Sequence, residues 1–463
     1  MAHQPHNRSR GQGESPALSA GGDTIAAIAT PAGRGGIGVV RVSGPHARRI
    51  ATEVAGALPA PRQATLATFL AADGGVLDQG LALFFPAPHS YTGEDVLELQ
   101  GHGGPIVMTQ LLRRCVDLGA RVADPGEFTR RAFLNDRLDL AQAESVADLI
   151  DAASVEAARS AARSLAGDFS ARIHALVDSL VELRVHVEAC IDFPEEEIDP
   201  ADRRWQDERL AALRARLDAL LDAARQGAVL REGLTVALVG RPNVGKSSLL
   251  NRLAGEDLAI VTPIAGTTRD YVRATISLEG VPVHLIDTAG LRDAAEEVER
   301  IGVERAWRAV ENAGAALFIE DAEGASAGDA ALRARLPETL PVARVVNKID
   351  LSGAAAGREE GGAQTVLRIS ARTGAGIDAL QAWLLEVAGW KPHGEGLFMA
   401  RERHLVALRE AHRHLETALD HTQAFELKAE DLRLAQAAMG RITGEVSADD
   451  LLGEIFSRFC IGK

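Results

Sequence analysis

The residues with the clearest chemical meaning form the segment Gly240-Arg241-Pro242-Asn243-Val244-Gly245-Lys246-Ser247, which has the form G-x-x-x-x-G-K-S. An apolar, strand-like run (234–239) precedes it, and a helix-like pattern begins at Ser248. Glycines let backbone N–H groups turn toward an anion at a helix N-terminus, so this context is typical of a phosphate-binding loop. We therefore expect Lys246 to reach the β- and γ-phosphates and Ser247 to bind Mg²⁺. The alternative, a glycine-rich turn with a chance Lys-Ser pair, fits this context poorly.

Two further segments supply partners for a metal and a γ-phosphate. The strand-like run 283–286 ends in Asp287-Thr288-Ala289-Gly290. There a carboxylate can hold the metal, partly through water, and the glycine N–H can face the γ-phosphate. Between this segment and the phosphate loop lies Gly266-Thr267-Thr268-Arg269-Asp270, a candidate switch with a metal-binding threonine.

Two loops that follow later strands indicate which base the nucleotide carries. One strand (344–346) ends in Asn347-Lys348-Ile349-Asp350. Asp350 can accept two hydrogen bonds from the N–H and NH₂ edge of guanine, which adenine lacks, so such a site rejects ATP. Ser370-Ala371-Arg372 follows another strand and can brace the base. These elements, in this order, resemble a translation-factor-like GTPase domain, which we expect to span residues 233–385.

In Ras-type GTPases a glutamine orients the water that attacks GTP, and this sequence has a different residue at that position. The residue after Asp287-Thr288-Ala289-Gly290 is Leu291, which cannot orient water as glutamine does. An acidic segment, Glu296-Glu297-Val298-Glu299, follows shortly. It can supply the missing group, or it can be the solvated start of a helix. The chemistry alone does not choose among these acids.

Composition limits the class of protein. The chain has 463 residues, 46% of them hydrophobic, and a net charge of −15, which argues against a non-specific nucleic-acid coat protein. Cys115, Cys190 and Cys460 lie far apart without a CxxC pair, as expected for reduced thiols in the cytosol. No apolar run reaches membrane-span length, so we expect no membrane association and a cytoplasmic location. Residues 1–22 are polar and glycine-rich, and we expect a disordered extension.

The remaining segments predict two further domains. Residues 23–135 read as a mixed α/β domain, in which the polar stretch Tyr91–Asp95 with His102 is either a site or a tight turn before a core strand. Long helical patterns occupy 136–232, including an a/d stripe from Ile173 to Val187, and return in 386–463. Helices on both sides of the GTPase domain predict that it is inserted into a helical domain.

With these motifs in place, the chain over residues 23–463 resembles the tRNA-modification GTPase family called MnmE or TrmE. The most specific pieces are Thr30–Gly36, Tyr91–Pro105, Pro125–Thr129, Arg131–Asp136 and Phe459–Lys463. The resemblance implies an α/β + α fold: an N-terminal mixed α/β domain that binds folate and dimerises, a long-helix bundle domain, and an inserted Ras-like, doubly wound P-loop GTPase domain.

The resemblance also implies partners and a reaction. With a flavin-dependent partner, MnmG or GidA, which carries the FAD, the family builds a carboxymethylaminomethyl-type group on the wobble uridine of tRNAs. The carbon comes from a tetrahydrofolate derivative, in a 5-formyl or methylene form. The folate contacts implied here are Arg41, Glu98, Arg137 and the terminal Lys463. Position 137 departs from the expected lysine, which keeps the charge but changes the geometry. The terminal cysteine motif falls on Cys460.

The resemblance further implies potassium-dependent GTP hydrolysis, in which a K⁺ ion supplies the charge of an arginine finger. It assigns the K⁺ ligands to Asn243, Thr262, Ile264 and Thr267, a Mg²⁺ ligand to Thr268, and the water-orienting acid to Glu299. The further GTP contacts that it implies are Val244, Ser248, Pro263, Ala265, Gly266, Thr288, Ala289 and Lys348.

Two other functions are compatible with parts of the sequence. A ribosome-assembly GTPase would act as an RNA-binding switch without modifying RNA, and we expect it to carry a basic appendage, whereas the flanking helices here are acidic. A folate-dependent one-carbon transferase with a regulatory GTPase domain is the second. Analysis of tRNA nucleosides in a deletion strain would separate all three.

Overall fold

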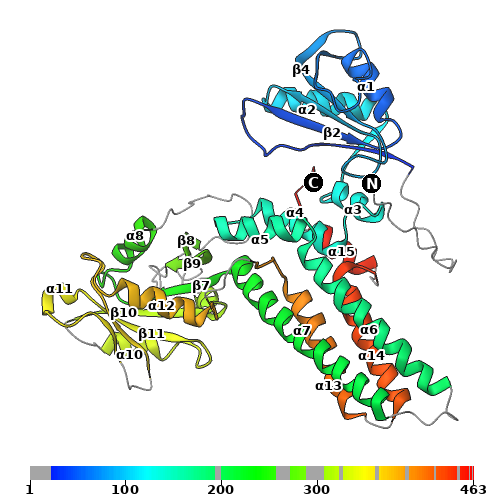
Figure 1. Ribbon diagram of the computed structural model, residues 1–463. Helices are drawn as coiled ribbons and strands as arrows, with labels where there is room; N and C mark the ends of the chain where they lie inside the picture. Colours follow the sequence, from blue (N-terminus) through cyan, green and yellow to red (C-terminus); the bar gives the residue numbers. More distant parts are fainter. Residues whose placement is uncertain are drawn as a thin grey trace. The chain divides into compact units, whose positions relative to one another are not determined.

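The computed structural model describes residues 22–192, 200–256, 272–287, 307–322, 327–359, 364–391, 396–421, 424–445, 449–457, 459–460 and 462 (Figure 1). The chain divides into two compact units, Met1–Ala143 with Ser447–Lys463, and Glu144–Val446. Residues 447–463, expected with the helical segments, cluster with the first unit. There α15 (Asp449–Ser457) packs against α3 (Glu127–Leu134), and the rings of Phe456 and Phe133 lie 6.5 Å apart.

The first unit is built on a mixed sheet with two helices on one face. Its described strands are β1 (Thr24–Ile28), β2 (Gly38–Ser43), β3 (Thr65–Leu70), β4 (Val76–Phe85), β5 (Val96–Gly101) and β6 (Ala120–Val122), in the order β3-β4-β5-β2-β1-β6. The pairs are antiparallel except β1 with β6. Apolar residues of α1 (Ala47–Ala55) and α2 (Pro105–Asp117) pack on the sheet. Pro105 begins α2, where a first-turn residue needs no N–H partner.

The helical segments of the second unit form a bundle. Figure 1 shows α6, α7, α13 and α14 running side by side. Their bounds, with those of two shorter helices, are α4 (Leu140–Ile150), α5 (Val155–Leu165), α6 (Asp168–Asp192), α7 (Pro200–Glu232), α13 (Glu402–Asp420) and α14 (Phe425–Thr443). The predicted a/d stripe from Ile173 to Val187 is buried in α6.

The sequence predicted long helical patterns over residues 136–232 but no helix boundaries within the part that precedes α7. Three helices occupy the segment. Ser154 is extended, and its side chain accepts a hydrogen bond from the N–H of Ala157, which caps α5. Gly167 has a φ of 98°, a left-handed conformation that interrupts the helical path before α6.

A buried cluster of charges joins α4 to the segments that enter and leave the GTPase domain. Arg403 donates to both carboxylate oxygens of Glu144, at 2.7 Å each. Arg401 donates to Asp148 at 2.7 Å, and Arg231, near the end of α7, donates to the same Asp148 oxygen at 2.9 Å. Glu144 is 1% exposed. The chain enters the GTPase domain after Arg231 and leaves it before Arg401 and Arg403. Both connecting segments are therefore bound to α4.

Titration of this cluster follows from its burial. Burial raises the pKa of the Glu144 carboxyl, but His404 and Arg403 more than offset this, and the pKa lies below its ordinary value. Burial lowers the pKa of His404, and the charge of Arg403 adds to this. Nδ1 of His404 accepts the N–H of Arg401, so the neutral ring carries its proton on Nε2, which lies 2.9 Å from Glu144.

We expect Glu144→Ala to lower the free energy of unfolding by about 3–5 kcal/mol, because it leaves the largely shielded guanidinium groups of Arg401 and Arg403 without this carboxylate. The contribution of Glu144 in the wild type is complete above about pH 4.5 and is lost as the pH falls below this ordinary value. Urea unfolding measured between pH 3 and pH 8 checks both statements.

The matched control is Glu430→Ala on α14, whose carboxylate forms an exposed pair with Arg433 at 2.7 Å. It should leave the free energy of unfolding nearly unchanged. Equal effects of the two substitutions would contradict the role of Glu144 as the centre of a buried cluster.

The GTPase domain is a largely parallel sheet with helices. Its described strands are β7 (Leu234–Val239), β8 (Val272–Leu278), β9 (Val281–Asp287), β10 (Ala315–Asp321), β11 (Val342–Asn347), β12 (Gly357–Glu359) and β13 (Val366–Arg368), in the order β12-β13-β11-β10-β7-β9-β8. Only the edge strands β8 and β12 in this described sheet are antiparallel to their neighbours. The helices with both ends described are α8 (Lys246–Glu256), α10 (Ala327–Arg333), α11 (Ile349–Ser352) and α12 (Ile377–Val387).

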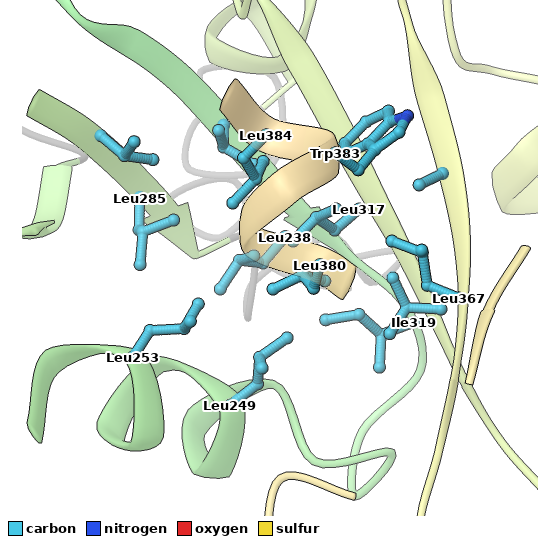
Figure 2. Close-up of a cluster of buried hydrophobic side chains, with 14 of the residues drawn as sticks. Leu238, Leu249, Leu253, Leu285, Leu317, Ile319, Leu367, Leu380, Trp383 and Leu384 are labelled. Carbon is cyan, nitrogen blue, oxygen red and sulfur yellow. The ribbon is translucent and has the colours of Figure 1, made fainter. Parts of the chain in front are cut away.

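The core of this domain lies between the sheet and helices α8 and α12. Figure 2 shows Leu249 and Leu253 of α8 and Leu380, Trp383 and Leu384 of α12 around strand residues that include Leu238, Leu317 and Ile319. Fully buried aliphatic side chains each contribute about 1.5–3 kcal/mol. This packing fixes α8 under the loop that leaves β7, so it determines where the helix N-terminus points.

The β8–β9 turn of the GTPase domain contacts the helical segments. Ser154, the cap of α5, donates its hydroxyl to the carbonyl of Gly280 at 2.6 Å. A Cβ atom at Gly280 would lie 2.7 Å from Cβ of Glu156, so the close approach requires glycine. Trp390 donates to the Glu279 carboxylate at 3.2 Å. The two parts of the second unit are thus joined by side-chain contacts as well as by the chain.

Candidate functional site

The phosphate loop connects β7 to α8 in the geometry that the motif predicts. Gly245 has a φ of 101°, and a Cβ atom there would lie 2.2 Å from Nδ2 of Asn347. Asn243 also has a positive φ, 64°, a conformation that asparagine adopts more readily than most residues. The loop lies at the carboxyl end of β7, between strands β9 and β10, where doubly wound sheets bind ligands.

Lysine and hydroxyl groups are placed for phosphate and metal chemistry. Lys246 is 8% exposed, and its ammonium donates to the carbonyls of Gly240 at 2.5 Å and Arg241 at 2.9 Å. Ser247 and Ser248, in the first turn of α8, are exposed, as is Asn243. An exposed hydroxyl at a helix N-terminus beside a buried ammonium suits a nucleoside triphosphate with its divalent cation.

The two predicted base loops lie together. Asn347 donates from Nδ2 to the carbonyl of Val244 at 2.9 Å and accepts the N–H of Ala371 at 3.0 Å. The Ser370 hydroxyl donates to Oδ1 of Asp350 at 2.7 Å, which holds this carboxylate at the edge of the loop. The structure therefore brings the phosphate loop, Asn347 and the Ser370–Arg372 loop into one site.

Lys348 and Arg372 flank this site. Lys348 has a φ of 63°, and its ammonium lies 3.9 Å from the Asp321 carboxylate. Arg372 is largely exposed, with its guanidinium 4.0 Å from Asp350. The strands that carry these loops were predicted, but β10, which bears Asp321 between β7 and β11, was not.

Part of the predicted site lies outside the described residues, and those assignments stay predictions. For Asp287 the structure gives the backbone, at the end of β9. The predicted residues outside the described ranges are Thr262, Pro263, Ile264, Ala265, Gly266, Thr267, Thr268, Thr288, Ala289, Gly290, Glu299 and Lys463.

We expect Gly245→Ala to weaken GDP binding by about tenfold or more, because a left-handed conformation costs an L-residue about 1–2 kcal/mol and the new Cβ displaces Asn347. Gly255→Ala on α8 is the matched control, because its Cβ meets open space. It should leave affinity unchanged and stabilise the helix slightly. Calorimetric titration with GDP measures both, and similar affinities for the two variants would refute the tight packing of the loop.

The first unit holds a second group of predicted residues. Arg41 on β2 and Glu98 on β5 are direct partners in the sheet, and Arg41 donates to Oε1 of Glu98 from Nε at 3.0 Å and from Nη2 at 2.8 Å. Nη1 of Arg41 donates to the carbonyl of Gly462 at 3.4 Å. The guanidinium carbon also lies 5.4 Å from the Tyr91 ring centroid and 5.8 Å from that of Phe128. The C-terminal segment therefore meets this arginine.

Arg137 and Cys460, the other described residues singled out in this unit, have fewer contacts with the group around Arg41. A Cβ atom at Gly93 would lie 3.4 Å from Cγ of Arg137, so the Arg137 side chain passes beside the loop that carries Tyr91. Cys460 is exposed, and its carbonyl accepts the N–H of Gly126 at 3.4 Å. A Cβ atom at Gly462 would lie 2.6 Å from the carbonyl of Ile28, which shows how closely the terminal segment approaches β1.

The polar stretch Tyr91–Asp95 binds mainly within its own unit. Its hydroxyl and carboxyl groups contact Thr129, Ser43, Arg131 and Arg48. His102 contacts the Asp78 carboxylate at 2.7 Å through Nδ1. These partners fit the interpretation of the stretch as a structural turn.

Arg131, a buried arginine of this unit, was not predicted from the sequence. Arg131 is 7% exposed and contacts the carboxylates of Glu94, Glu127 and Asp23 at 3.1, 3.0 and 2.7 Å. Burial raises the pKa of Glu127, but its hydrogen bonds to Arg121 and Arg131 outweigh this, so the pKa lies below its usual value. The only sequence signal was that Arg131 begins one of the segments most typical of the family.

Within the described ranges, no cluster of three or more His, Cys, Asp or Glu residues could hold a metal ion. No helix among the described residues is long and apolar enough to cross a membrane.

The fold and the phosphate and base loops define a P-loop GTPase with two additional domains. A family model described as "MnmE helical domain" matches residues 140–460, and one described as "GTP-binding protein TrmE N-terminus" matches residues 24–137. The chain is 62% identical to the tRNA modification GTPase MnmE of Azoarcus sp. over 95% of its own length and 98% of that protein. It is 61% identical to the protein of the same name from Ralstonia nicotianae, over 95% and 96% of the two chains. The chain belongs to the MnmE (TrmE) family of tRNA modification GTPases, and it is a GTP hydrolase.

A solved structure, the Aquifex aeolicus Era protein bound to GDP and tetrafluoroaluminate, is 28% identical. It covers 39% of this chain and 66% of its own, with a TM-score of 0.27.

Proposed function

We propose that this chain is a K⁺-activated GTPase that acts with an FAD-dependent partner, MnmG or GidA. Together they use a tetrahydrofolate one-carbon unit to install a carboxymethylaminomethyl-type group on the wobble uridine of tRNAs. The observation that carries the proposal is membership of the MnmE family over nearly the whole chain, with matches to its N-terminal and helical domain models. We further propose a cytoplasmic location and a homodimer formed through the N-terminal domain.

The domain boundaries are part of this proposal. The folate-binding domain covers 23–135, the helical domain 136–232 and 386–463, and the inserted GTPase domain 233–385. The order of β7 and α12 between α7 and α13 supports the insertion. The contacts of α15 in the first unit support a shared role for the C-terminal segment in the folate domain.

For the GTPase site, the geometry of Asn243, Lys246, Ser247 and Asp350 supports GTP with Mg²⁺. We assign Mg²⁺ to Ser247 and Thr268, and K⁺ to four residues that include the exposed Asn243. The other three are Thr262, Ile264 and Thr267. When bound, these ions supply positive charge at the phosphates, and the chain itself orients the phosphates through Lys246 and the N-terminus of α8.

For the folate site, the meeting of Arg41, Glu98 and Gly462 supports the proposal. Folates carry carboxylates and a flat heterocycle that offers N–H donors. An arginine with two aromatic rings near its guanidinium and a half-buried carboxylate can recognise both features. Lys463 would add a further charge beside Gly462, and Arg137 would line the neighbouring loop.

The test of the overall function is mass spectrometry of tRNA nucleosides from a strain that lacks this gene. The modified wobble uridine should disappear and should return with the wild-type gene. An unchanged nucleoside profile would refute the proposal and favour a ribosome-assembly GTPase. If the modification is lost in the deletion strain but fully restored by a GTPase-inactive variant, the result would favour a one-carbon transferase with a regulatory domain.

We expect Arg41→Ala to weaken binding of 5-formyltetrahydrofolate by about tenfold to a hundredfold, the loss typical of hydrogen bonds to charged groups. Removal of Lys463 should also weaken folate binding, and neither change should alter GTP affinity. Calorimetry with each ligand measures these effects. Arg48→Ala, which breaks an exposed pair with Asp95, is the control and should bind folate normally. Unchanged folate affinity in both variants of the site would rule out this site.

A further inference from the structure

Arg252 lies on α8, the helix that begins in the phosphate loop, and reaches the loop that faces the base. Its Nε donates to the carbonyl of Ala371 at 3.1 Å, and its Nη2 donates to the carbonyl of Arg372 at 2.5 Å. The donors of a guanidinium lie in one rigid plane. One side chain that binds two successive carbonyls therefore fixes the orientation of the peptide group between them.

The same turn is held from its other side. The N–H of Ala371 donates to Oδ1 of Asn347, which contacts the phosphate loop at Val244. Ser370, the preceding residue, donates its hydroxyl to Asp350. Asn347 thus fixes an N–H of the turn, and Arg252 fixes its carbonyls. The base loop is linked to the phosphate loop once through Asn347 and once through α8.

We propose that Arg252 is a positioning residue for the nucleotide base: it sets the distance between the Ser370–Arg372 loop and the phosphate loop. The proposal rests on the assignment of Asp350 and Ser370–Arg372 to the guanine site. Arg252 is half-buried on the second turn of α8, its carbonyl partners lie 119 and 120 positions further along the chain, and α8 itself is fixed by Leu249 and Leu253 in the core. A rigid helix can therefore act as the spacer between phosphates and base.

Loss of Arg252 should therefore affect binding of the base and binding of the phosphates differently. Without Arg252, the base loop loses its hold on α8 while the phosphate loop keeps its contact with Asn347. Binding of the base should weaken, and binding of phosphates alone should not. Catalysis at saturating GTP should also be unchanged, because Arg252 holds two carbonyls of the base loop.

The experiment compares Arg252→Ala and Arg252→Lys with the wild-type full-length chain. Release of a fluorescent GDP is followed by stopped flow, and inorganic pyrophosphate is used as a competitor that lacks a base. Arg252→Ala should release GDP about tenfold faster, the loss typical of one charge-assisted hydrogen bond. Its affinity for pyrophosphate and its kcat should equal those of the wild type, and its KM for GTP should rise. Arg252→Lys, which can bind one of the two carbonyls, should release GDP at a rate between those of the wild type and Arg252→Ala.

Arg358→Ala is the control, because Arg358 forms an exposed pair with Glu386 at the edge of the same domain, and it should release GDP normally. Unchanged GDP release in Arg252→Ala would overturn the proposal. Equal losses of GDP and pyrophosphate would also overturn it, because they would show a general loosening of α8. Asp350→Asn tests the base site itself: if that variant keeps its preference for GTP, the guanine assignment fails independently of Arg252.

Discussion

Glu299→Ala should lower GTP turnover by about 10²–10⁴-fold, the usual contribution of a positioned general base. Leu291 stands where Ras-type enzymes have the glutamine that orients water, so the proposed site needs an acid from elsewhere. GDP affinity should stay nearly constant, because the loss falls on the transition state. Single-turnover hydrolysis, measured in KCl and again in NaCl, gives the rate.

The potassium site provides the companion variant. Asn243→Ala should remove the difference between KCl and NaCl, because Asn243 is a proposed K⁺ ligand on the phosphate loop. We expect the wild type to be faster in K⁺ than in Na⁺, because a ring of oxygens suits the larger ion. Dimerisation of the GTPase domains across the switches would complete this ring. If Glu299 only begins a helix, Glu299→Ala will change stability slightly and turnover hardly at all, which would refute its assignment.

Asp350→Asn should shift the preference from guanine toward xanthine nucleotides, by an overall factor on the order of 10⁴. The carboxylate accepts hydrogen bonds from the N–H groups of guanine, whereas an amide can donate to the extra carbonyl of xanthine. The Ser370 hydroxyl donates to Asp350 at 2.7 Å, so the side chain at position 350 is held in place. Competition of GDP and XDP against a fluorescent nucleotide measures the shift.

Asp378→Asn is the matched control for this change, because Asp378 is an exposed carboxylate in the first turn of the nearby α12. It should leave the preference for GDP intact. An Asp350→Asn variant that still prefers GDP as strongly as the wild type would show that this loop does not read the base. ATP should bind neither the wild type nor the control.

Much of the GTPase site was predictable because each of its motifs is short and continuous. Phosphate contacts require glycines and a lysine in one loop, and the base requires an acid directly after a strand. The structure confirms the strands before these loops and brings Gly245, Asn347 and Asp350 into one site. The family was also predictable, because its motifs recur along nearly the whole chain.

Helix boundaries were predicted less well than the loops of the GTPase site. Apolar periodicity continues from α4 through α6, so the pattern alone does not mark where one helix ends and the next begins. The interruptions depend on a capping serine, Ser154, and on the left-handed Gly167. Ser154 also contacts the β8–β9 turn, which lies 126 positions away in the sequence. Its role as a boundary is therefore partly a tertiary effect.

The sequence by itself determined the class of nucleotide, the phosphate and base loops, and the three kinds of domain. Tertiary structure alone decided which distant residues meet. Arg41 contacts Gly462 across 421 positions, Arg403 contacts Glu144 across 259, and Arg252 contacts Ala371 across 119. Periodicity and motifs record what each segment needs locally, such as an apolar face or a turn. They do not record which surfaces pack together, and it is that packing which buries Glu144 among arginines and brings the C-terminal segment to the N-terminal domain.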